Sequence, residues 1–226
     1  MKFQPLGVGK HKRPEDGTCV MEKVSLLWSY AKGKRVYFTD LPTCTNKVVA
    51  LVAQLINDDS EEEKRQHLNT MIPRLLRARR TKSDKRVAIR LCIWALGQSE
   101  EEMWPHSGRD WLRKQLQMYL EGKVINPLVE FDKEDNFFRL ANSWLVRPLL
   151  RILEDNFSNA AADLIEMFLT KADNPAETLD RLLDAWEEAV TKEGEDLYVP
   201  QPWEDEALAF VAEMMACESE PEVEPS

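Results

Sequence analysis

The stretch Asp16-Gly17-Thr18-Cys19-Val20-Met21-Glu22 (DGTCVME) opens the helix on which the rest of the chain is expected to pack. Gly17 lets the chain turn, and the Thr18 hydroxyl can accept from a first-turn amide, so Thr18 is the predicted N-cap. Apolar residues follow on two sides: Val20, Met21, Val24, Leu27, Trp28 and Ala31 on one, and Cys19, Leu26 and Tyr30 on the other. A helix that is apolar on both sides is expected to be buried, with Cys19 and Trp28 in the core. Gly33 is typical of the residue that follows a helix.

Cys19 and Glu22 are the candidate catalytic residues of this helix. The first turn of a helix favours a thiolate, although a free cysteine is also a common small buried residue. Glu22 is expected to project away from the main apolar face. If residues 33–43 fold back on the helix, Asp40 and Cys44 join Cys19 and Glu22, and two thiols with two carboxylates suit a soft-to-borderline metal. The spacing matches no known site pattern.

Outward from this helix, capping residues and apolar periodicity predict an all-α, multi-helix globular bundle of about nine or ten helices. The expected helix starts are Thr43 or Thr45, the capping box Ser60–Glu63, Ser83, Ser107, Ser158 and Asn174-Pro175-Ala176-Glu177. Pro73 and Pro148 lie inside apolar patterns, so a kink or a helix junction is expected near each. Gly122 and Gly194 are expected to end helices, and the last helix is expected around 203–215.

Four regions are expected along the chain. Residues 1–15 carry Gly, Pro and basic residues without periodicity, which predicts a flexible arm. Residues 16–122 form the first helical domain. Residues 123–217 form an acidic helical region that packs on this domain or makes a second subdomain. Residues 218–226 read as a disordered acidic tail.

The charge is distributed unevenly over the 226 residues, whose net charge is −10. Residues 1–113 hold 21 Lys and Arg against 14 Asp and Glu, which gives +7. Residues 114–226 hold 9 against 26, which gives −17. This asymmetry indicates either a basic face for an acidic partner or two halves that attract each other.

The strongest candidate binding surface is a basic stretch around residues 74–90. It contains Arg74, Arg77, Arg79, Arg80, Lys82, Lys85, Arg86 and Arg90 against one acid, Asp84. A corner between two helices there could contact the phosphates of a nucleic acid, also through the N-terminus of the helix at Ser83. It could equally be a solvated face, pair with the acidic second half, or bind an acidic protein. Because specific nucleic-acid binding usually accompanies a basic domain and the pI is about 5.0, nucleic acid is the alternative and a protein is the leading partner.

The motifs of common enzymes are absent from the sequence: HExxH, GxSxG, GxxxxGK[ST] and GxGxxG do not occur. No cofactor is expected, and the leading interpretation is a non-enzymatic interaction or accessory protein. The four cysteines (19, 44, 92 and 217) form no CxxC pair, and no apolar run could span a bilayer. We therefore expect a cytoplasmic protein with reduced thiols and no membrane contact.

The first half resembles a group of uncharacterised proteins from actinobacteria and their phages. The resemblance covers roughly residues 16–115 and rests on DGTCVME (16–22), DLPTC (40–44), NDD (57–59), MIPRL (71–75) and a helix that ends in Trp94-Ala95. The segment 33–39 is more basic and aromatic than in that group. No activity is known for the group, so the resemblance implies a helical fold and an accessory or host-interacting role, and no functional residue.

Overall fold

The computed structural model describes residues 5–33, 38–98, 106–123, 147–154 and 157–198. Within these ranges there are helices and one isolated parallel bridge between Leu6 and Thr18, but no strand, which confirms the all-α fold. None of the helices in the described part is long and apolar enough to cross a membrane. The helix expected at 203–215 and the acidic tail 218–226 lie outside the described residues.

Helix α1 (Val20–Ala31) begins one residue later than expected, and Cys19 is its N-cap. The Cys19 Sγ atom accepts from the Glu22 amide at 3.4 Å, while the Glu22 carboxylate accepts from the Cys19 amide at 2.8 Å. Thr18 does not cap, because its backbone pairs with the N-terminal segment: Gly7 donates to the Thr18 carbonyl at 2.8 Å. The helix therefore has a capping box whose hydroxyl position is taken by a thiol.

Burial on both sides of α1 is confirmed, since nine of its 12 residues are buried. Trp28 is an exception to the prediction, because it is only partly buried. Cations cover its ring instead: the Arg79 guanidinium carbon lies 4.3 Å and the Lys32 Nζ atom 4.6 Å from its centroid. Cation–π contacts of this kind keep an aromatic ring near the surface.

The described part of the N-terminal segment, residues 5–15, is docked on the helices and is not the free arm that was predicted. Leu6 is buried, and its amide and carbonyl both bond the Gln66 side chain, at 2.9 and 3.1 Å. The Gly9 amide donates to Asp58 at 2.8 Å, and the short 3₁₀ helix Pro14–Asp16 follows. Apolar periodicity could not predict the docking of this segment, because polar side chains from distant parts of the chain hold it in place.

Helix α2 (Lys47–Asp59) is capped by Asn46, and not by Thr43 or Thr45. Asn46 Oδ1 accepts from the amides of Val48 and Val49, at 3.0 and 3.3 Å. Its Nδ2 group donates to Asp84 at 3.0 Å, which ties the start of α2 to the start of α5 (Asp84–Gln98). Thr45 is unavailable as a cap because its hydroxyl donates to the Leu75 carbonyl at 3.3 Å.

Replacing this cap tests the junction of α2 and α5. Asn46→Ala should lower the free energy of unfolding by about 1–2 kcal/mol, because two helix amides lose their acceptor and Asp84 loses a donor. The exposed neighbour Thr43 supplies the control, and Thr43→Ala should leave the urea midpoint nearly unchanged. Equal losses in the two variants would show that Asn46 contributes no cap.

Helix α3 (Glu62–Arg65), the 3₁₀ helix η2 (Gln66–Met71) and α4 (Ile72–Arg77) follow in succession. Pro73 is in the first turn of α4, which confirms a helix junction there. Ser60 does not form the predicted capping box: it is the C-cap of α2, and its hydroxyl donates to the Ile56 carbonyl at 2.5 Å. The hydroxyl is thus committed to the preceding helix.

The remaining helices are α6 (His106–Leu120), α8 (Arg147–Leu153), α9 (Phe157–Phe168) and α10 (Pro175–Lys192). Asn174 caps α10 by accepting from the Ala176 amide at 3.0 Å, as predicted. Ser107, the predicted cap, lies within the bounds of α6, and Pro148 lies in the first turn of α8. The kink expected at Pro148 depends on residues 133–146, which are outside the described ranges.

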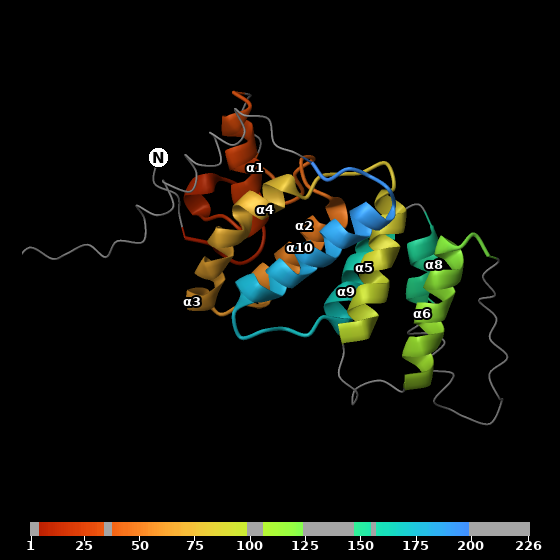
Figure 1. Ribbon diagram of the computed structural model, residues 1–226. Coiled ribbons are helices and arrows are strands. Elements are labelled where there is room, and N and C mark those ends of the chain that lie inside the picture. The colour runs from red at the N-terminus through yellow and green to blue at the C-terminus, as the bar shows by residue number, and fades with distance from the viewer. Residues whose placement is uncertain (1–4, 34–37, 99–105, 124–146, 155–156, 199–226) are drawn as a thin grey trace, which may run out of the picture.

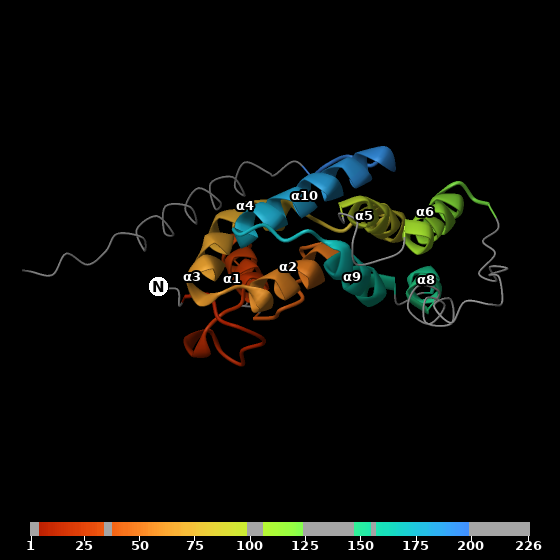
Figure 2. The same ribbon diagram turned by 90° about the horizontal axis from the view of Figure 1, so that it is seen from below.

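The helices form two layers, which Figure 2 shows from below: α10, α5 and α6 lie in one, and α2, α9 and α8 in the other. Helix α5 packs on α9, and α10 packs on both α2 and α5. One hydrophobic cluster runs through both layers and contains residues of the basic and the acidic half. The two halves of the chain therefore share a core, and residues of α1, η2 and α4 extend it, at the end where Figure 1 shows α1 and α4.

Candidate functional site

The Glu22 carboxylate, which was predicted to project away from the main apolar face of the helix, lies inside the protein and is held by hydrogen bonds. Its side chain has no solvent exposure. It accepts from the Cys19 and His11 amides at 2.8 Å each, and the His11 Nδ1 atom lies 2.8 Å from Oε2. This carboxylate joins the N-terminal segment to α1, and its contacts are those of a structural group.

The cysteine environments do not favour a nucleophile. Burial, with the nearby Glu22 charge, raises the pKa of Cys19 to about 12, and the hydrogen bond from the Glu22 amide offsets this only in part. Burial likewise raises the pKa of Cys44 and of Cys92. Reactive cysteines have lowered pKa values and some exposure, whereas these three are buried.

The structure does not bring the four predicted metal ligands together. Cys19 contacts Glu22, but Asp40 Oδ1 lies 3.2 Å from Lys10 Nζ, and the Cys44 Sγ atom lies 3.7 Å from the Thr45 hydroxyl. Over the described ranges, no three His, Cys, Asp or Glu side chains are placed to hold a metal ion. Asp40 is instead in an ion pair with Lys10 of the N-terminal segment.

The basic segment, defined as residues 74–90 with the eight cations named above, spans α4, the connection 78–83 and the start of α5. In Figure 1 this connection (yellow) meets the C-terminal end of α10 (blue). The pairing of this segment with the acidic half, one of the predicted alternatives, is present in the structure. Among the described residues, carboxylates of the second half meet the segment at three places.

The first contact is between Arg74 and α10. The guanidinium pairs with Asp180, with Asp184 at 2.9 Å and with Glu187 at 2.8 Å. Burial by itself would lower the pKa of Arg74, but hydrogen bonds to the three carboxylates outweigh it and the pKa is raised. One cation thus bridges three carboxylates on one face of α10 and holds α4 against that helix.

The second contact is a carboxylate between two arginines. Glu193, which follows α10, pairs with Arg86 and with Arg90 Nε at 2.5 Å, and its side chain is only 5% exposed. Burial acts to raise the pKa of Glu193, but the hydrogen bonds and charges of Arg86 and Arg90 prevail, so the pKa is lowered. Arg86 also donates to the Leu120 carbonyl at 3.0 Å, which extends the contact to α6.

The third contact covers the N-terminus of α5. Beyond Gly194, the four residues Glu195–Tyr198, here called the strap, cross the connection 78–83. The Glu195 carboxylate accepts from the backbone amides of Lys82 at 2.9 Å and Ser83 at 2.6 Å. The hydrogen bond to Ser83 lowers the pKa of Glu195. The predicted phosphate position at this helix start is therefore occupied by a carboxylate of the same chain.

An aromatic ring fixes the far end of the strap. The Tyr198 ring centroid lies 3.3 Å from the Arg79 guanidinium carbon, and Trp28 lies on that guanidinium at 4.3 Å. Arg79 is thus in contact with rings from α1 and from the strap. Trp28, near the end of α1, therefore contacts both Arg79 and Lys32 through its ring.

Part of the basic segment remains at the surface. Arg77, Arg80 and Lys82 are exposed, and we call them the exposed basic edge. Lys85 is turned inward, since its Nζ atom donates to the Leu153 carbonyl at 2.5 Å. The structure thus divides the predicted binding residues into an inner set that pairs with the acidic half and an outer set that faces solvent.

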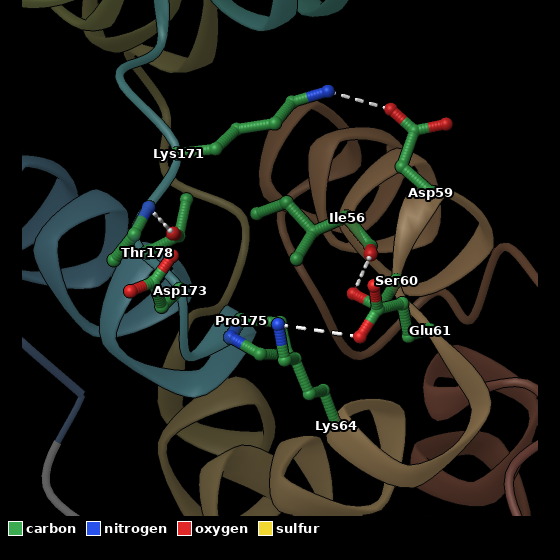
Figure 3. A pocket seen from close by; sticks show the side chains of 10 residues that line it. Ile56, Asp59, Ser60, Glu61, Lys64, Lys171, Asp173, Pro175 and Thr178 are labelled. Carbon is green, nitrogen blue, oxygen red and sulfur yellow. Dashed lines mark hydrogen bonds and ion pairs between the residues drawn. The ribbon is translucent and has the colours of Figure 1, made fainter.

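A pocket that the sequence did not indicate lies between α2, α3 and the start of α10 (Figure 3). Its volume is about 290 Å³, and Ile56 and Pro175 contribute apolar walls. Lys171 reaches Asp59 across it at 2.6 Å, and Lys64 pairs with Glu61 at 3.2 Å. In Figure 3 these polar side chains point toward one another and form pairs within the pocket. We therefore interpret the pocket as a contact between helices and not as a binding site.

No family model, curated protein or solved structure matches this chain. Sequence reasoning missed Glu193, Glu195 and Tyr198, and the only signal for them was the excess of acid in the second half.

Proposed function

We propose that this chain is a non-enzymatic interaction protein that binds a carboxylate-bearing segment of another protein along the exposed basic edge. The proposal is supported by the carboxylate that is already bound beside that edge. Two consecutive backbone amides of the connection 78–83 donate to Glu195. Arg77, Arg80 and Lys82 continue the same positive surface outward. A surface that binds its own carboxylates has the donors that an acidic partner needs.

An acidic protein fits this surface better than a nucleic acid, which is the alternative. A duplex presents a negative charge about every 1.7 Å along its axis, so it contacts a wide area. The ridge of α10 beside the basic segment carries Asp184 and Glu188, both exposed, which would repel that charge. A short acidic segment can lie along the edge without meeting α10.

The cytoplasmic, accessory and host-interacting roles implied by the resemblance to actinobacterial and phage proteins belong to the same proposal. Thiol and metal chemistry find less support. The cysteines of the described part are buried, and burial raises their pKa values. Such thiols hold their protons at neutral pH, which disfavours a nucleophile, and over the described ranges no three His, Cys, Asp or Glu side chains are placed to hold a metal ion.

Charge reversal on the edge tests the proposal. A fluorescent oligoglutamate peptide should bind the wild-type chain at low salt, and Arg77→Glu with Arg80→Glu should weaken binding at least about tenfold. The control is Arg113→Glu with Lys114→Glu, which makes the same charge change at exposed positions of α6. A 30-base-pair duplex is titrated in parallel. Equal peptide binding by both double variants contradicts the proposed edge, and tighter binding of the duplex than of the peptide favours the alternative.

A further inference from the structure

We propose that the strap is a self-ligand, and that the surface beneath it binds a partner segment carrying a carboxylate and, three residues further on, an aromatic ring. The inference rests on the proposed function and names the chemistry of the partner. Glu195 and Tyr198 have this spacing and occupy this surface in the structure. A partner segment with the same pattern would take their place.

The strap is separable from the fold that holds it. Helix α10 ends in a Schellman motif, in which Gly194 (φ 71°) donates to Thr191 and Glu195 donates to Val190. The motif satisfies the carbonyls of Val190 and Thr191 through backbone amides, and the backbone of the strap after Glu195 takes no part in it. Within the strap, Asp196 and Leu197 are exposed, so no apolar side chain there is buried in the core.

The surface beneath the strap is held by residues that do not depend on it. Lys82 and Ser83 precede α5, and Asp84 fixes their turn by accepting from the Thr81 amide at 2.7 Å and from Asn46 at 3.0 Å. Arg79 follows α4 and rests on Trp28 of α1. The two amides and the guanidinium therefore keep their positions when the strap leaves, and a preformed site binds with little ordering cost.

Each contact of the strap corresponds to a class of group on the partner. Two consecutive amides at the start of a 15-residue helix suit a carboxylate, which Glu195 shows directly. The Arg79 guanidinium suits an aromatic ring, and Tyr198 supplies one in the structure. The exposed basic edge beside them adds attraction for acidic neighbours in the partner segment.

Glu193 is not part of the displaceable set. Its side chain is buried between Arg86 and Arg90, so it remains with α10. Among the described residues, Glu195–Tyr198 are therefore the ones that a competing segment must displace. The withdrawal gives up hydrogen bonds and a stacked ring that the partner then restores.

The test removes the self-ligand and supplies it in trans. The probe is a labelled, acetylated peptide with the sequence of residues 193–198, Glu-Gly-Glu-Asp-Leu-Tyr, titrated into the full chain. The double variant Glu195→Ala with Tyr198→Ala should bind it at least about tenfold more tightly than wild type, because the site is no longer occupied by the chain itself. A control peptide with Gln for the second Glu and Ala for Tyr should bind the variant at least about tenfold more weakly.

Two further variants distinguish failure of this inference from failure of the proposed function. Glu195→Gln removes one anchor with minimal change, so its affinity should fall between wild type and the double variant. Glu177→Ala removes an exposed carboxylate from the opposite end of α10 and should bind like wild type. If wild type and the double variant bind the probe equally, the strap is not a self-ligand, and the proposed function stands. If neither binds the probe or oligoglutamate, the proposed function fails together with this inference.

Discussion

Glu22→Ala is expected to lower the free energy of unfolding by about 3–5 kcal/mol, because a buried charged acceptor is removed while its donors stay buried. The Cys19 and His11 amides and the His11 ring all lose their partner in this variant. A cavity would also remain at a position without solvent exposure. The N-terminal segment loses its attachment to α1 at the same time.

Glu177 provides a matched control for this prediction. It stands in the first turn of α10 as Glu22 does in α1, but it is exposed. Glu177→Ala should therefore change stability far less. Urea unfolding followed by far-ultraviolet circular dichroism measures both variants, and similar losses would show that the buried network adds nothing to the capping position itself.

Glu193→Gln is the second large prediction, with an expected loss of about 2 kcal/mol at neutral pH. The figure is smaller than for a fully buried pair because Arg86 and Arg90 keep part of their hydration. Gln retains the size of the side chain but not the charge that both guanidiniums face. Losing that charge leaves the two arginines close to each other without a counter-ion.

The loss should depend on pH in a definite direction. The pKa of Glu193 is lowered in the folded chain from an ordinary value of 4.5. Its carboxylate therefore stabilises the fold above that pH, and the contribution is lost as pH falls through the lowered folded value. The stability difference between wild type and Glu193→Gln should be constant near pH 7 and shrink in acid.

The surface pair of Glu188 with Lys192 serves as the comparison. The two side chains are 63% and 55% exposed, and the pair lies on one face of α10. Glu188→Gln should change the urea midpoint little at any pH, because exposed pairs contribute little. A Glu193→Gln loss that is as small, or that persists unchanged in acid, would contradict the role assigned to the two arginines.

Features with a local cause were predictable from the sequence. The two ends of α10 were predicted from Asn174, Pro175 and Gly194, because each of these residue types has its own preference for a helix end. The structure confirms both ends. Pro73 likewise indicated the junction before α4. Two-sided apolar periodicity was enough to predict the burial of α1.

Features that depend on distant residues were not predictable from spacing. The helix start at Cys19 depends on the pairing of Leu6 and Gly7 with Thr18, and the cap at Asn46 depends on Thr45 being occupied by Leu75. The charge asymmetry suggested that the halves attract, but not which residues meet. Glu193 lies 107 residues from Arg86, and no periodic pattern connects such positions.

The separation of Arg86 and Glu193 along the chain also has a consequence during synthesis. A ribosome adds about 5–20 residues per second, so the roughly one hundred residues between Arg86 and Glu193 take about 5–20 seconds to make. Throughout that interval the nascent chain displays its arginines without the acids that later cover them. Residues 1–113, which carry a net charge of +7, are thus made before residues 114–226, which carry −17, and the basic part must wait for the acidic part that pairs with it.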